Sequence, residues 1–312
     1  MNDDIFIAIA SFKDDELYTT VFDLVEKSDK PENLHFGIIH QYDNTDKKTS
    51  ENSLDYLEKI FNVDIIKIPY EKSKGGCWAR QRVQHLLKEQ KYHLQIDSHT
   101  RMISGWDTMC KKVYNDLLKQ SDKPIISFLP PSYFRNDKLG IDYEFHNINF
   151  LNKLNIPKVK FMSNEYWIDI VGYDNVKELK EHTQIPFLYG GFIFSSSEWV
   201  REIEQDPKHY YTGEEFALSI RSFTHGYDIY LPSKIMAWHR GNGENKPKHF
   251  TTLSDGKPEH QVAMKQLKKL IEGGDLGKYG LGEVRSLREY ETFAHIDFEN
   301  KKVNLNENIF KE

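Results

Sequence analysis

Blocks of apolar and polar residues alternate along the first hundred positions and predict strands separated by helices. Apolar segments of strand length occur four times, at Ile5–Ala10, Leu34–His40, Val63–Ile68 and Tyr92–Asp97. The first of them, Ile5–Ala10, is apolar throughout, which is typical of a strand that is buried on both faces of a parallel sheet. The polar stretches between them carry helical patterns, such as the one over residues 17–25. Alternation of this kind predicts an α/β fold with a doubly wound, mostly parallel sheet.

The pattern becomes less regular after residue 100. A helix is predicted at Gly105–Lys119 and a fifth strand at Ile125–Leu129, which Pro130 ends. From about 132 to 184 the periodicity is poor, and aromatic and polar residues are mixed. We interpret this stretch as an insertion with irregular or antiparallel strands that forms one wall of a cleft.

Regular patterns return in the last third of the chain. Pro186–Phe194 predicts a returning strand, in which Gly190 and Gly191 indicate a bulge or a close approach of the backbone to a ligand. A helix at Phe216–Thr224 and a strand at Ile235–Trp238 precede a polar stretch over residues 241–249.

The composition limits the classes of protein that this chain can represent. Its 312 residues are 38% hydrophobic, which is enough for the core of one large α/β domain. A net charge of −6 argues against an extended basic surface for nucleic acid. Two cysteines provide no disulfide framework and fit a reducing compartment. Neither a leader pattern nor an apolar run of roughly 20 residues occurs, so we expect a cytoplasmic protein that does not bind membranes.

Three side chains with metal-binding chemistry stand at the ends of predicted strands. Asp97 ends the fourth strand, His99 follows two residues later, and His239 comes directly after a late strand. In open α/β sheets, ligands bind at the carboxyl edge where such strands end. A hard divalent cation such as Mn²⁺ or Mg²⁺ needs few protein ligands when substrate phosphates complete its shell. The alternatives are a solvated turn at Asp97 and His99 and a surface histidine at His239.

Two helix starts carry further candidate chemistry. Gly75 and Gly76 open a helix that bears Arg80, which favours an anion near exposed backbone N–H groups. Glu214 and Glu215 begin another helix and would hold an acceptor or balance positive charge on a sugar. Solvated arginines and a simple helix-dipole effect remain the alternative explanations for these two patterns.

Several of these segments occur together in the order found in one known family. They are Ile9–Asp14, Leu94–Arg101, Gly105–Asp107, Thr212–Glu215, Arg221–Tyr227, Tyr279–Gly282 and Arg285–Leu287. The set resembles the polypeptide α-N-acetylglucosaminyltransferase family, whose best-known member glycosylates a hydroxyproline of the Skp1 protein. The resemblance extends from near residue 5 to about residue 297. It implies a GT-A glycosyltransferase domain over residues 1–240, with the insertion at about 132–184. Residues 241–312 would form a C-terminal, largely helical extension that packs on this domain.

The resemblance also implies an activity and roles for individual residues. The activity is metal-dependent, retaining transfer of N-acetylglucosamine, or another sugar, from a UDP-sugar to a hydroxyl acceptor. An Asp-x-His motif in place of the commoner Asp-x-Asp assigns metal binding to Asp97, His99 and His239. Glu214 and Glu215 are the implied catalytic pair near the sugar and the acceptor. Donor binding is implied for Ser11, Phe12, Arg80, Gln95 and Ser98.

The chemistry of this reaction agrees with the residue types, while the acceptor stays open. Cleavage of a sugar–phosphate bond develops negative charge on the diphosphate, which a cation and an arginine stabilise. Retention is expected by a front-face route, and double displacement through Glu214 or Glu215 is the alternative. The acceptor is a protein, a glycan or modified DNA, the last as in phage-type transfer to hydroxymethylated bases. An inactive nucleotide-sugar-binding protein on the same fold is a further alternative.

Overall fold

A central eight-stranded sheet organises the described part of the chain. The computed structural model describes residues 3–135, 148–150, 152–162, 168–211, 213–241, 247–253 and 257–303. The strand order is β11-β13-β6-β12-β4-β1-β2-β3. The bounds of these strands are β1 (Ile5–Phe12), β2 (Leu34–Tyr42), β3 (Val63–Pro69), β4 (Tyr92–Asp97), β6 (Pro124–Ser127), β11 (Thr183–Gln184), β12 (Phe192–Ser196) and β13 (Asp228–Leu231). Because β4, β1, β2 and β3 run parallel, and β13 runs parallel to β6, the predicted mostly parallel sheet is confirmed.

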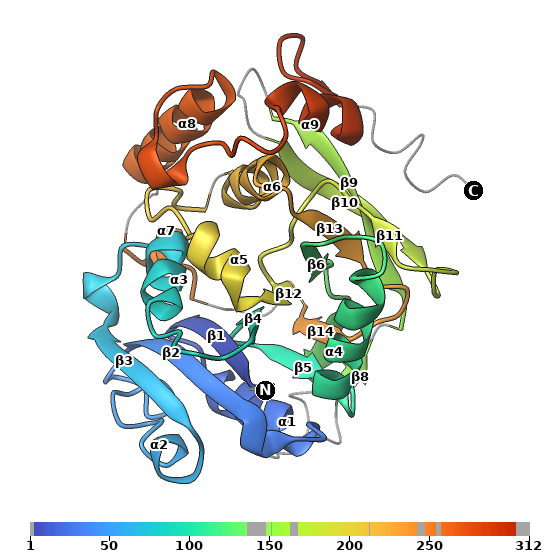
Figure 1. The fold of residues 1–312 in the computed structure, drawn as a ribbon. Coiled ribbons are helices and arrows are strands. Elements are labelled where there is room, and N and C mark those ends of the chain that lie inside the picture. Colours follow the sequence, from blue (N-terminus) through green and yellow to red (C-terminus); the bar gives the residue numbers. More distant parts are fainter. Residues whose placement is uncertain are drawn as a thin grey trace.

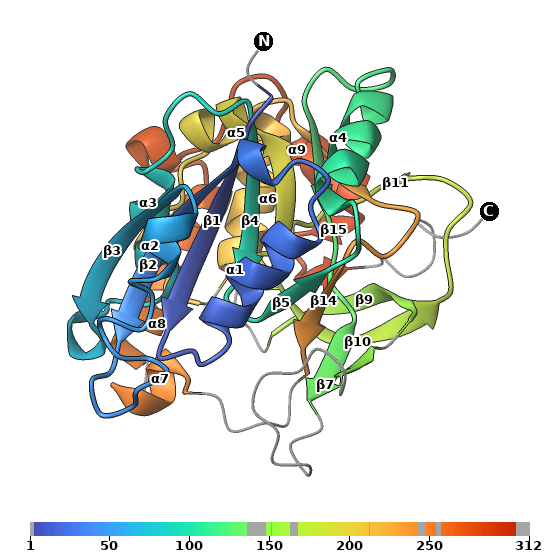
Figure 2. The same ribbon diagram turned by 90° about the horizontal axis from the view of Figure 1, so that it is seen from below.

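The apolar run of β1 explains why this strand lies inside the sheet, between β2 and β4. Its side chains alternate between two faces, as they do in any strand. Ile7 belongs to the main core cluster with Val21, whereas Phe6 belongs to a second cluster with Val83. These partners lie on α1 (Leu17–Glu26) and α3 (Gly76–Gln84), which cover opposite faces of the sheet (Figure 2).

The other helices surround the sheet (Figure 1). They are α2 (Leu57–Ile60), α4 (Trp106–Leu117), α5 (Ser197–Glu202), α6 (Glu214–Thr224), α7 (His249–Thr252), α8 (Lys257–Ile271) and α9 (Leu287–Ala294). Both α8 and α9 contact α6, so the C-terminal segment packs against the part of the chain that begins with Glu214. None of the helices in the described ranges has the length and apolar character that a membrane crossing requires.

The predicted strand over Pro186–Phe194 is wrong in extent. Strand β12 begins only at Phe192 and runs antiparallel to both β4 and β6. The backbone amides of Leu188, Tyr189 and Gly190 donate to the side chains of distant residues instead of to a neighbouring strand. The glycines therefore precede the strand and lie over the site described below.

A second, four-stranded sheet contains the late strand that was predicted at Ile235–Trp238. Its order is β5 (Thr100–Met102), β14 (Ala237–Arg240), β7 (Ser132–Arg135) and β8 (Ile148–Phe150). Strand β14 runs antiparallel to β5 and pairs His239 with Thr100. Strands β9 (Leu154–Phe161) and β10 (Ile168–Val176) form a separate antiparallel pair. The rest of the predicted insertion, at 136–147, 151 and 163–167, lies outside the described residues.

Candidate active site

The pairing of β14 with β5 brings three metal-competent side chains together. Asp97 ends β4, and the chain turns through Ser98 and His99 directly into β5. His239 Nε2 lies 2.9 Å from His99 Nε2 and 3.2 Å from Asp97 Oδ2. One ligand atom from each of these three residues lies within 4.8 Å of the others. One carboxylate and two imidazoles suit a divalent transition metal such as Mn²⁺, so the side chains fit the predicted cation.

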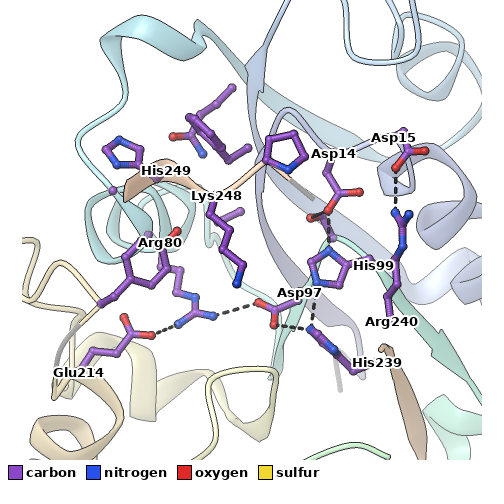
Figure 3. Close-up of a pocket in the computed structure, with 18 residues that line it drawn as sticks. Asp14, Asp15, Arg80, Asp97, His99, Glu214, His239, Arg240, Lys248 and His249 are labelled. Atoms are coloured by element: carbon purple, nitrogen blue, oxygen red, sulfur yellow. Dashed lines mark hydrogen bonds and ion pairs between the residues drawn. The ribbon is translucent and has the colours of Figure 1, made fainter. Parts of the chain in front are cut away.

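Arg80 links this cluster to the start of α6. Its Nη2 donates to Asp97 Oδ1 at 3.0 Å and to the carbonyl of Gly190 at 3.3 Å, while Nη1 donates to Glu214 (Figure 3). Burial alone would raise the pKa of Asp97. The hydrogen bond from His239 and the charge of Arg80 outweigh burial and hold that pKa well below its usual range. Asp97 is therefore an anion that presents one oxygen to Arg80 and the other to His239.

The two glutamates at the start of α6 have different surroundings. Glu214 accepts hydrogen bonds from the Arg80 guanidinium and from the thiol of Cys77. Glu215 Oε1 accepts the amide N–H of Gly190 at 2.6 Å. Burial raises the pKa of Glu215 to about 7, and the charge of Glu214 adds to that rise. Glu214 is thus paired with the Arg80 cation, whereas Glu215 changes its charge near neutral pH.

The three metal-competent side chains, Arg80 and Glu214 line a cleft of about 390 Å³. This volume is within the range of small-molecule sites. The lining residues are Ala10, Phe12, Asp14, Asp15, Gln41, Gly75, Gly76, Arg80, Asp97, Ser98, His99, Tyr211, Glu214, His239, Arg240, Pro247, Lys248 and His249. Seven of the ten residues singled out from the sequence are among them.

The other three residues, Ser11, Gln95 and Glu215, are not part of the cleft lining. Ser11 is fully buried, and its carbonyl accepts a hydrogen bond from Gln41. Gln95 is also buried and donates to the carbonyl of Gly190 at 2.9 Å. The side chains of Gln95 and Glu215 therefore hold the backbone of Gly190, and the Ser11 side chain is buried. The predicted roles of these three residues stay predictions.

Several lining residues were not predicted as site residues from the sequence. Asp14 and Asp15 follow β1, the parallel neighbour of β4. That neighbouring position is the signal that could have identified them, because parallel strands end at the same edge. Tyr211 and Lys248 come from loop segments, and His249 begins the short helix α7; their place at the cleft depends on tertiary packing.

Comparisons with known proteins identify the family and the fold of this chain. The family model described as Glycosyltransferase (GlcNAc) matches residues 4–59 and 55–300. No curated protein sequence matches the chain. Among solved structures, GalNAc-T7 with UDP, GalNAc and Mn²⁺ is similar with a TM-score of 0.58 and 15% identity over 93% of this chain. The chain spans about half (54%) of the length of that protein.

A second similar structure is TarS of S. aureus in complex with UDP-GlcNAc. Its TM-score is 0.51 at 11% identity, over 88% of this chain and 68% of that one. At such identities the likeness concerns the fold, and it confirms the predicted GT-A architecture. Since the family model spans most of the 312 residues, the chain belongs to the GlcNAc glycosyltransferase family.

Proposed function

We propose that this chain transfers a sugar, N-acetylglucosamine in the first instance, from a UDP-sugar to a hydroxyl group. The observation that carries the proposal is the group of Asp97, His99 and His239 inside a cleft at the carboxyl end of β4. Membership in a glycosyltransferase family supports sugar transfer. The structures of GalNAc-T7 and TarS, which contain UDP or UDP-GlcNAc, support a UDP-sugar as the donor.

The donor's diphosphate would lie between the three metal ligands and Arg80. A Mn²⁺ or Mg²⁺ ion held by Asp97, His99 and His239 would supply positive charge to the leaving diphosphate. A guanidinium has five N–H donors, and the contacts of Arg80 to Asp97, Glu214 and Gly190 use three of them. The remaining donors are available to a phosphate oxygen in the cleft.

We further propose that the transfer retains configuration by a front-face route. The bond between the sugar C1 and the phosphate oxygen breaks, the acceptor oxygen bonds to C1 on the same face, and the leaving phosphate takes the acceptor's proton. The surroundings of the two glutamates support this route over double displacement. Both oxygens of Glu214 accept hydrogen bonds, and Glu215 faces the amide of Gly190. A nucleophile would need a carboxylate that is open toward the sugar.

The first acceptor that we propose is a polypeptide hydroxyl, the acceptor class of the family that the sequence resembles. The free thiols of Cys77 and Cys110 are consistent with a reaction in a reducing compartment such as the cytoplasm.

The test is release of UDP from a panel of nucleotide sugars with Mn²⁺ present. We expect release from UDP-sugars, loss of release with EDTA, and a loss of at least 100-fold in Asp97→Ala. Asp122→Ala, which removes an exposed aspartate, serves as the matched control and should retain full activity. Absence of UDP-sugar binding and turnover with either Mn²⁺ or Mg²⁺ would refute the proposal. Binding without release would identify an inactive nucleotide-sugar-binding protein.

A further inference from the structure

Three consecutive carboxylates follow β1, and each contacts a segment that carries or adjoins a proposed metal ligand. Asp14 Oδ2 lies 2.5 Å from Nδ1 of His99. Asp15 pairs with Arg240, the residue after His239, at 2.9 Å. Glu16 binds the Arg101 guanidinium and accepts the hydroxyl of Tyr133 at 2.5 Å. The loop after β1 therefore packs against the turn between β4 and β5.

Asp14 differs from the other two because its partner is the proposed ligand itself. A carboxylate can only accept a hydrogen bond, so the contact requires a proton on Nδ1 of His99. The proton on Nδ1 leaves Nε2 with a free lone pair, and Nε2 is the atom that faces His239 at 2.9 Å. Asp14 thus selects the tautomer and the ring orientation that metal binding needs (Figure 3).

The carboxylate of Asp14 is itself held in place by the surrounding structure. Oδ1 accepts the amide N–H of Glu16 at 2.8 Å, and Oδ2 also accepts the hydroxyl of Ser98 at 2.8 Å. The side chain is 10% exposed. Rigid support of this kind fixes the imidazole of His99 before a ligand arrives.

We propose that Asp14 is a positioning residue for the metal site, acting through the imidazole of His99. This inference rests on the proposed function, since it assumes that His99 binds a cation. Outer-shell carboxylates of this type typically change metal affinity by about 10- to 100-fold when they are removed.

The experiment titrates the metal-free full chain with MnCl₂, without nucleotide, and follows free Mn²⁺ by electron paramagnetic resonance. Asp14→Ala should raise the Kd for Mn²⁺ by at least tenfold. Asp14→Asn, whose amide oxygen still accepts from Nδ1, should bind more tightly than Asp14→Ala. Asp122→Asn is the matched control, because it removes the same charge from an exposed position that is not part of the cleft lining, and should stay within threefold of the wild type. Equal Kd values for Asp14→Ala and the wild type would overturn the proposal.

A second readout separates this proposal from the proposed function. Long-range ¹H–¹⁵N NMR of the metal-free protein at pH 8 reports which nitrogen of His99 carries the proton. We expect the Nδ1–H tautomer in the wild type and a mixture in Asp14→Ala. An unchanged tautomer in Asp14→Ala would overturn the positioning role even if Mn²⁺ does not bind to any variant. If Asp14→Ala does not fold, as judged by circular dichroism, Asp14→Leu, which also lacks a side-chain acceptor for Nδ1 of His99, replaces it in both readouts with the same expected results.

Discussion

Glu215 should make the stability of the protein depend on pH in a direction opposite to that of most carboxylates. Its pKa is raised from an ordinary value of 4.5 to about 7, first by burial and then by the charge of Glu214. The native state therefore holds a proton that the unfolded chain releases at lower pH. Between pH 4.5 and 7 the native state binds more protons than the unfolded state, so the free energy of unfolding falls as the pH rises.

The size of this effect follows from the two pKa values. Each pKa unit corresponds to about 1.4 kcal/mol, so a rise from 4.5 to about 7 corresponds to roughly 3 kcal/mol at full ionisation. In Glu215→Gln the side chain is neutral at every pH, and its amide oxygen can still accept the N–H of Gly190. The variant should match the wild type most closely near pH 4.5, gain stability relative to it as the pH rises to 7, and keep that advantage above pH 7.

The assay is urea unfolding of both proteins at intervals from pH 4.5 to 8.5. The informative quantity is the difference in free energy of unfolding between the variant and the wild type, since other titrating groups contribute equally to both. Glu198→Gln, which changes an exposed glutamate in α5, is the control and should give a constant difference. A difference for Glu215→Gln that is constant over the same range would refute the reasoning.

Two glycine substitutions test the close packing around the cleft. A Cβ at Gly190 would lie 2.7 Å from Nη1 of Arg80, so Gly190→Ala should displace the guanidinium and weaken UDP-sugar binding about tenfold by calorimetry; unchanged affinity would contradict the proposed role of Arg80. A Cβ at Gly282 would lie 2.5 Å from the carbonyl oxygen of Thr224, which is backbone and cannot rotate away. Gly282→Ala should therefore cost about 1–3 kcal/mol in urea unfolding. Gly172→Ala is the control for both variants, because its Cβ would meet no atom of the described residues within 4 Å. Equal stability of Gly282→Ala and Gly172→Ala would exclude the clash at Gly282.

The first half of the sheet could be predicted from the sequence because its signals are local. Each of the strands β1 to β4 is a short apolar run, and the connections between them are short enough for right-handed crossovers. Helix α2 is only a single turn, although apolar residues recur at helical spacing over Leu54–Phe61, because apolar spacing alone does not determine helix length. Strand β12 was mispredicted for a different reason. The amide of Gly190 binds Glu215, 25 residues away, and no local pattern reports such a partner.

Part of the candidate site could likewise be predicted from local sequence, whereas the rest depends on contacts between distant segments. Asp97 and His99 are two residues apart at a strand end, so their proximity follows from the sequence. His239 lies beside them only because β14 belongs to the second sheet, where it pairs with β5. The contact between Asp14 and His99 depends on β1 lying next to β4. Adjacent strands in a parallel sheet need not be adjacent in sequence, and 85 positions separate these two residues.

The different surroundings of Glu214 and Glu215 lead to a last prediction about Glu215. Arg80 pairs with both Asp97 and Glu214, so burial of these carboxylates is offset by a cation. Glu215 instead accepts its hydrogen bond from the neutral amide of Gly190, and ionising it there is costly. Perturbed carboxyl groups of this kind cluster at functional sites, where stability is often traded for activity. Glu215→Gln should therefore be more stable than the wild type at pH 8 and slower in sugar transfer. Greater stability with undiminished transfer would contradict that assignment.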